Sequence, residues 1–210
     1  MIFYIFAYLL CRTRAKGEAF DKVARMLCLP IGGGGGPAVE RLAREGDPST
    51  FPLPVPMQNR PDCDFSYSGL KTSIRTAMNN LKRERGIEND ADLPHKDKAD
   101  IAASFQNVAI RHIEQRVRRC MNMLDEEGSG IRCLAVVGGV AANTELRTRL
   151  QALCNKRRES WSMFVPPPRL CTDQGAMSAW AAIERITVGS TDEADDQEVY
   201  ARFPFAEISS

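Results

Sequence analysis

Hydrophobic residues recur every three or four positions over several long stretches of the chain, a spacing typical of amphipathic helices. It predicts helices over residues 17–29, 38–45, 70–85 and about 100–127, another that follows Asn143, and a last one from about residue 172 to 186. The longest helix, which Asp100 is expected to cap, carries the clearest apolar stripe. That stripe consists of Ile101, Phe105, Val108, Ala109, Ile113, Val117, Cys120 and Leu124.

Two short apolar runs, Cys133–Val137 and Ser162–Val165, have the composition of buried strands in a mostly parallel sheet. Strand and helix alternate over residues 131–187, which predicts an α/β layer fold. Several prolines between residues 51 and 61 predict an extended segment. We expect residues 88–98 to form an exposed polar connection and residues 190–210 a solvated tail.

The chain opens with eleven mostly apolar residues, followed by Arg12, Arg14 and Lys16. This run is too short to span a bilayer, which takes about 20 residues. Its positive charges follow the run instead of preceding it, unlike a secretory signal. Two interpretations stay open: a strand buried on both faces, or a natural protein that begins further upstream.

Composition narrows the class of protein. The 210 residues contain 43% hydrophobic and 26% charged residues, which is ordinary globular usage. A formal charge of +1 gives no bulk attraction to DNA or to an acidic membrane. Seven cysteines without a C-x-x-C pair form neither a disulfide framework nor a structural zinc site. We therefore expect a reducing compartment and mostly buried thiols.

The strongest candidate for chemistry is the turn after the first strand, Gly138-Gly139, which leads to Asn143. Glycines let the backbone approach a ligand closely, and free N–H groups at a helix start favour phosphate. Asn143 is either an ordinary helix cap or a hydrogen-bond partner of a nucleotide. Asp173 stands at the start of the last helix and is likewise either a cap or a hard oxygen ligand at the same sheet edge.

The other candidates are weaker. His95 lies in the polar connection and is expected to be exposed, whereas His112 borders the apolar stripe and is expected to pack in the core. Neither an H-E-x-x-H nor a G-x-S-x-G pattern is present, so the sequence does not support a zinc protease or a serine hydrolase. Residues 156–158 form a basic cluster that we expect to be solvated.

Six segments follow one another along the chain: G-E-A-F-D-K (17–22), G-G-P (35–37), F-S-Y-S-G-L-K-T (65–72), D-I-A-A-S-F-Q (100–106), G-G-V-A-A-N (138–143) and P-P-P-R-L-C-T-D (166–173). Together and in this order they resemble the tRNA threonylcarbamoyladenosine synthase family, formerly called O-sialoglycoprotein endopeptidase. The resemblance covers about residues 17–189 and is strongest to mitochondrial or plastid members, with the cytoplasm as the alternative location. It implies the actin, Hsp70 and sugar-kinase fold, of which this chain resembles mainly the second lobe.

The resemblance also implies roles for particular residues. Asp21, Gly36, Glu40 and Asn143 match substrate-binding positions, Gly138 and Gly139 match the nucleotide loop, and Asp173 matches a metal ligand. The implied cofactor is one divalent ion, iron or zinc, with two further ligands from an H-x-x-x-H motif. His95 and His112 are seventeen residues apart and do not match that motif. Residues 1–16 also match nothing expected there, so we expect the histidines in a first lobe that this chain lacks.

The implied activity is transfer of a threonylcarbamoyl group from threonylcarbamoyl-AMP to the adenosine beside the anticodon of tRNAs that read A-starting codons. The expected partners are tRNA, threonylcarbamoyl-AMP and a second copy in a homodimer, with no DNA and no membrane span. A 210-residue chain that lacks the histidine pair is expected to be inactive by itself. The alternative is a non-catalytic module of the same family that binds a nucleotide or a partner.

Overall fold

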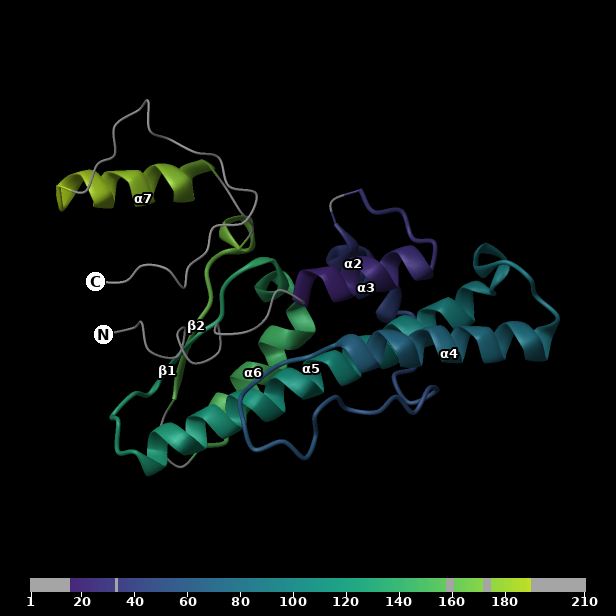
Figure 1. The fold of residues 1–210 in the computed structure, drawn as a ribbon, viewed down its shortest axis with the longest axis horizontal. Helices are drawn as coiled ribbons and strands as arrows, with labels where there is room; N and C mark the ends of the chain where they lie inside the picture. Colours follow the sequence, from purple (N-terminus) through teal and green to yellow (C-terminus); the bar gives the residue numbers. More distant parts are fainter. Residues whose placement is uncertain (1–15, 33, 158–160, 172–174, 190–210) are drawn as a thin grey trace. The chain divides into compact units, whose positions relative to one another are not determined.

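The computed structural model describes residues 16–32, 34–157, 161–171 and 175–189 (Figure 1). The chain divides into two compact units, residues 1–172 and residues 173–210. All the residues predicted to bind substrate lie in the first unit. Asp173 lies outside the described residues.

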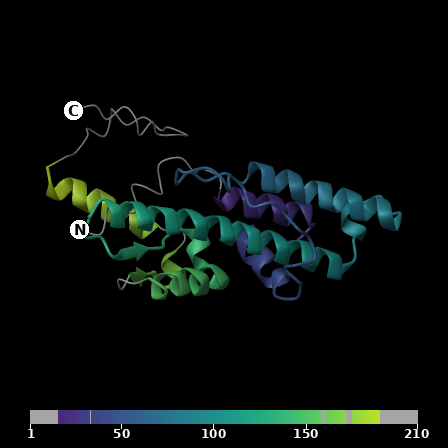
Figure 2. The same cartoon turned by 90° about the horizontal axis from the view of Figure 1, so that it is seen from below.

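Four α-helices form the larger part of the first unit: α2 (Lys16–Met26), α3 (Gly35–Ala43), α4 (Ser68–Arg85) and α5 (His95–Glu126). A 3-10 turn, η1 (Asp90–Asp92), precedes α5. Figures 1 and 2 show α5 running through the unit, with α2, α3 and α4 packed beside its first half. We expected residues 88–98 to be an exposed connection. They include the first turn of α5, in which Asp97 is buried and forms an ion pair with Arg85.

The apolar stripe of α5 forms the centre of the core. Every residue of the predicted stripe is buried, and the ring of Phe105 meets that of Phe20 on α2 edge to face, with centroids 4.9 Å apart. The prediction that Asp100 caps this helix is wrong, because the helix begins five residues earlier, with Pro94 at its N-cap. The Asp100 carboxylate instead accepts hydrogen bonds from the backbone N–H of Asp47 and from Lys96, each at 2.7 Å.

Two strands, β1 (Cys133–Ala135) and β2 (Ser162–Phe164), pair in parallel with Leu134 opposite Met163. Between them lie the 3-10 turn η2 (Gly139–Ala142) and the helix α6 (Thr144–Asn155), and the short 3-10 turn η3 (Pro168–Leu170) follows. This arrangement confirms a mixed α/β structure with parallel strands. The strands are less buried than expected: only Leu134 is buried, and Val137, beyond the end of β1, is 41% exposed.

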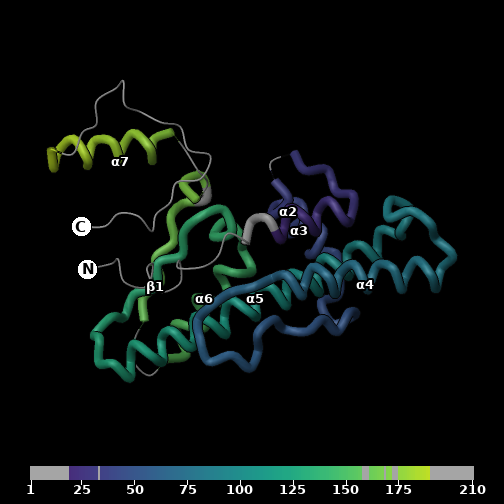
Figure 3. The backbone as a smooth tube through the Cα atoms, in the orientation of Figure 1, coloured from purple at the N-terminus to yellow at the C-terminus, as the bar shows by residue number. Residues whose placement is uncertain are grey.

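The segment between α3 and α4 runs back along α5, as the tube in Figure 3 shows. Gly46 packs so closely that a Cβ there would lie 2.0 Å from the carbonyl oxygen of Ala99. Further along, Phe51 N–H donates to Ser104 Oγ. The prolines keep this segment out of any helix, as predicted.

The histidines behave as expected: His112 is wholly buried between the rings of Phe65 and Tyr67, and His95 is exposed. Cys28 is exposed and has a positive φ of 56°, so it lies outside the first helix, which was predicted to continue to residue 29. The cause is that α2 ends at Met26, and the chain turns there.

The second unit contains α7 (Gly175–Thr187), which confirms the last predicted helix over its described residues. Its larger apolar side chains, Met177, Trp180, Ile183 and Ile186, are 46–64% exposed. Among the described residues, no helix combines the length and the hydropathy needed to cross a membrane.

Candidate functional site

Asp21 and the glycine-rich loop meet at the start of α3. Asp21 Oδ1 accepts the backbone N–H of Gly35 at 2.8 Å. A Cβ on Gly35 would lie 2.5 Å from the Asp21 Cα, so only glycine permits this approach. Gly36 follows in the first turn of α3 with open space where a Cβ would project. The structure thus brings Asp21 and Gly36, predicted separately, to one helix N-terminus, where the helix dipole favours negative charge.

Glu40 lies one turn further along α3 and connects it to a distant helix. Its Oε1 accepts the backbone N–H of Thr144, the first residue of α6, at 3.0 Å. The same oxygen pairs with Arg44 at 3.0 Å. A carboxylate therefore satisfies one of the free N–H groups at the α6 N-terminus, across 104 residues of sequence.

Asn143 acts as the N-cap of α6. Its Oδ1 accepts the N–H of Leu146 at 2.9 Å, and its Nδ2 donates to Gln106 Oε1 at 3.0 Å. The side chain is buried, so its orientation is fixed by these two bonds. The cap interpretation is thereby confirmed. One Nδ2 hydrogen has no hydrogen bond among the described residues, so the structure does not exclude the nucleotide interpretation.

Gly138 and Gly139 form the turn before this cap. Gly138 adopts φ = 88°, which glycine tolerates at no steric cost, and η2 starts at the next residue. Neither glycine has an atom within 4 Å of the position that a Cβ would take. The backbone of this turn is thus open to close approach by a ligand.

A cavity of about 390 Å³ lies between α3, α5 and the start of α6. Its volume is in the range of small-molecule pockets. Polar groups on its wall come from Glu40, Arg44, Gln106, Asn107, Thr144 and Glu145. Of the predicted substrate residues, Glu40 lines the cavity directly, and Asn143 contacts its wall through Gln106. Asp21 and Gly36 are not part of its lining.

Sequence reasoning missed Gln106 and Asn107 as residues of this region. Asn107 Oδ1 accepts a hydrogen bond of 2.8 Å from Nη1 of Arg149, and the same guanidinium group also forms an ion pair with Glu114. Gln106 stands at the end of the D-I-A-A-S-F-Q segment, where a buried amide interrupts an apolar face. That interruption is the signal that would have pointed to it. In the basic cluster, Arg157 bonds Asn122 and Asp125 on α5, so it is not simply solvated.

The described residues do not fit a divalent metal site. They contain no group of three or more histidine, cysteine, aspartate or glutamate side chains placed to hold an ion. His112 is enclosed by aromatic rings and His95 pairs with Glu45 at 2.7 Å, so the histidines share no site. Asp173, the predicted metal ligand, lies outside the described residues.

The sequence profile of the tRNA N6-adenosine threonylcarbamoyltransferase family, TsaD, matches residues 3–180. This chain belongs to that family. The match begins within the apolar start, for which the motif comparison found no counterpart.

Curated relatives carry the same name. Proteins called tRNA N6-adenosine threonylcarbamoyltransferase from Afipia carboxidovorans, Rhizobium johnstonii and Ruegeria pomeroyi are 47%, 44% and 43% identical over 178, 193 and 182 residues. The alignments cover 85%, 90% and 86% of this chain but only 46%, 49% and 47% of the relatives. The chain thus spans about half the length of the curated relatives that it matches.

Proposed function

We propose that this chain forms the adenylate-holding part of a tRNA N6-adenosine threonylcarbamoyltransferase and corresponds mainly to the second lobe of the family fold. The observation that carries this proposal is the hydrogen bond from Thr144 N–H to Glu40, which joins two of the predicted substrate-binding segments. Gly36 lies in the first turn of the same α3 helix, Asp21 of α2 accepts a hydrogen bond from Gly35 there, and Asn143 directly precedes Thr144. Segments 120 residues apart thus meet around α3 and the start of α6.

In the proposed reaction, the exocyclic amine of the tRNA adenosine attacks the carbamoyl carbon of threonylcarbamoyl-AMP. A C–N bond forms, the bond from that carbon to the phosphate oxygen breaks, and AMP leaves with the electron pair. The amine loses one proton to solvent. The chain's own residues orient the adenylate: Glu40 accepts from a ribose hydroxyl, Asn143 donates its second Nδ2 hydrogen to the adenine ring, and the N–H groups at Gly138–Gly139 face the phosphate.

A divalent metal ion needs more ligands than the described residues place together. Asp173 with two histidines from another part of the protein, on iron or zinc, remains our proposal. A mitochondrial or plastid location and a homodimer also remain proposals.

Binding of AMP to the full chain, measured by isothermal titration calorimetry, tests the adenylate site. Replacing Glu40 with Gln should weaken binding about tenfold, because a charged acceptor toward the ribose is lost. Glu45→Gln is the matched control, since Glu45 pairs with exposed His95 away from the cavity. Equal affinity of the two variants would show that AMP does not contact Glu40.

A transfer assay with tRNA and threonylcarbamoyl-AMP separates the enzyme from the non-catalytic alternative. We expect no turnover from the 210-residue chain alone, and turnover once the missing part of a relative is supplied as a second polypeptide. Turnover by the chain alone would contradict the expected inactivity. AMP binding without transfer in both assays would favour the non-catalytic module.

A further inference from the structure

Three sulfur atoms converge where the segment before α4 crosses α5. The Sγ of Cys63 lies 3.8 Å from the Sδ of Met123. The thiols of Cys63 and Cys120 are near enough for each to influence the pKa of the other. Cys120 and Met123 are three residues apart on α5 and therefore share one face of that helix. We call these three residues the sulfur cluster.

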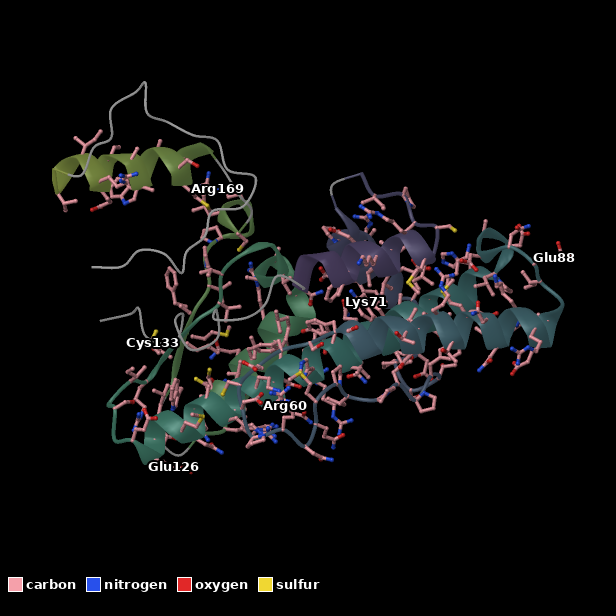
Figure 4. The ribbon with its side chains drawn as sticks, in the orientation of Figure 1. Arg60, Lys71, Glu88, Glu126, Cys133 and Arg169 are labelled. Carbon is pink, nitrogen blue, oxygen red and sulfur yellow. The ribbon has the colours of Figure 1, made fainter. Side chains whose placement is uncertain are left out.

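A buried arginine fixes the segment that presents Cys63. Arg116 is wholly buried and donates to the carbonyl oxygens of Met57, Arg60 and Asp62, the last from the residue that precedes Cys63. Arg119 adds a bond to the carbonyl of Gln58 at 3.1 Å. Arg60 is labelled in Figure 4, where this segment lies beside α5. The position of Cys63 relative to α5 is thus set before any ligand binds.

Burial keeps both thiols of the cluster protonated, and two arginines oppose this at Cys63. Burial raises the pKa of the Cys63 thiol, and the positive charges of Arg116 and Arg119 oppose that rise. Burial also raises the pKa of Cys120, to about 12. Within the described part of the chain, Arg116 Nε and Arg119 Nη1 are buried without a hydrogen-bond partner. The guanidinium groups of Arg116 and Arg119 near Cys63 would offset the negative charge of a thiolate complex formed there.

We propose that Cys63, Cys120 and Met123 bind one soft monovalent metal ion, Cu(I), through two thiolates and one thioether. The two thiol protons leave to solvent, and the resulting complex carries one negative charge beside the two arginines. Two sulfurs that each lie about 2.3 Å from one ion are about 3.8–4.0 Å apart, which agrees with the spacing of Cys63 and Met123. Thiolate and thioether donors select Cu(I) over harder ions.

An ion can reach the sulfur cluster from solvent, because two of its three side chains are partly exposed. Cys63 and Met123 are partly exposed, whereas Cys120 is buried, so the cluster has one accessible side. Neither thiol needs to leave its element to reach the ion. The site is independent of the proposed adenylate site, which is built from α3, η2 and α6.

Competition for Cu(I) between the full reduced chain and a chromogenic chelator, without oxygen, tests the proposal. We expect one equivalent of Cu(I) and, by X-ray absorption, sulfur ligands only. Cys63→Ser and Cys120→Ser should each weaken binding at least a hundredfold, and Met123→Leu, which keeps the volume of the side chain, about tenfold. Circular dichroism and the thermal midpoint of each variant show whether it folds.

Cys154→Ser is the matched control, because Cys154 is also a buried thiol near a second one, Cys133. Its Cu(I) affinity should equal that of the unmodified chain. A loss of affinity in Cys154→Ser together with none in Cys63→Ser would overturn the proposal. So would a Cys63–Cys120 disulfide in non-reducing peptide maps combined with no uptake of Cu(I) by the reduced chain.

Discussion

The long helix α5 and the two-stranded sheet bury very different shares of their residues. Nineteen of the 32 residues of α5 are buried, whereas Leu134 alone is buried among the six residues of β1 and β2. In the same region, Phe164 is 58% exposed. The two regions belong to one unit, and α5 contains many charged residues whereas the strands, CLA and SMF, contain none, so hydrophobicity does not explain the difference.

The difference lies in where each element finds its partners. A helix satisfies its backbone hydrogen bonds internally and needs only packed faces, which α3, α4 and α6 supply to α5, together with Phe20 of α2. A parallel strand needs neighbouring strands for its backbone and covering layers for both faces. Among the described residues, β1 and β2 pair only with each other. Within the described residues, the helical core is therefore well covered, whereas the two strands are not.

The same substitution in each region gives the largest contrast. Phe105→Ala removes a wholly buried ring that packs against Phe20 and should cost about 3–5 kcal/mol of unfolding free energy. Phe164→Ala should change stability by less than about 0.5 kcal/mol, because that ring is mostly exposed. Urea unfolding followed by circular dichroism measures both. Similar losses would show that Phe164 is covered in solution.

A glycine pair tests how tightly the helical region is packed. Gly46→Ala should cost about 2 kcal/mol or more, since the added Cβ would meet the Ala99 carbonyl and the backbone must shift. Gly36→Ala is the control, because its Cβ would enter open space in a helix, where alanine is favoured by up to about 1 kcal/mol. Thermal unfolding of both variants gives the comparison. A neutral Gly46→Ala would mean that this turn is looser than the structure shows.

Acid should weaken the helical region through Asp100. The carboxylate is desolvated by burial, but hydrogen bonds from Lys96 and the Asp47 N–H outweigh this and lower its pKa. A folded-state pKa below the unfolded value of about 3.9 means that the stabilisation is present above that pH and is lost as the pH falls below it.

Asp100→Asn should therefore cost about 1–2 kcal/mol at neutral pH and flatten the loss of stability below about pH 4. Asp92→Asn, in the exposed turn η1, is the control and should leave the neutral-pH stability unchanged. Unfolding curves collected between pH 2.5 and 7 provide the measurement. An unaltered acid profile in Asp100→Asn would assign the acid sensitivity to other carboxylates.

The smallest expected effect concerns the side-chain bonds that join α6 to α5. Arg149 on α6 reaches Glu114 and Asn107 on α5 and is only partly exposed, so Arg149→Met should cost about 1 kcal/mol. His95→Gln breaks a more exposed pair with Glu45 and should cost less than about 0.5 kcal/mol. Chemical unfolding of both variants compares them. A larger loss in His95→Gln would reverse the expected ranking of the two pairs.

Local patterns predicted the helices well because a helix depends on residues three and four positions apart. The stripe from Ile101 to Leu124 is buried as expected, and Asn143 caps α6 as its residue type favours. The prediction placed the start of α5 too late because its first turn consists of polar residues such as His95 and Lys96, which do not extend the apolar stripe. The end of β1 was predicted at Val137 because that residue is apolar, but the strand ends at Ala135 and Val137 is exposed.

The sequence by itself determined the helical pattern, the parallel strand order and, through ordered motifs, membership of the family. The tertiary structure decided which of those motifs meet: Glu40 with Thr144, Asp21 with Gly35, and Asn143 with Gln106. It also decided that Cys63 lies beside Cys120 and Met123 of α5, although Cys63 is far from both in the sequence. The physical reason is that contacts between distant segments arise from packing against α5, and packing depends on the whole set of neighbours at once.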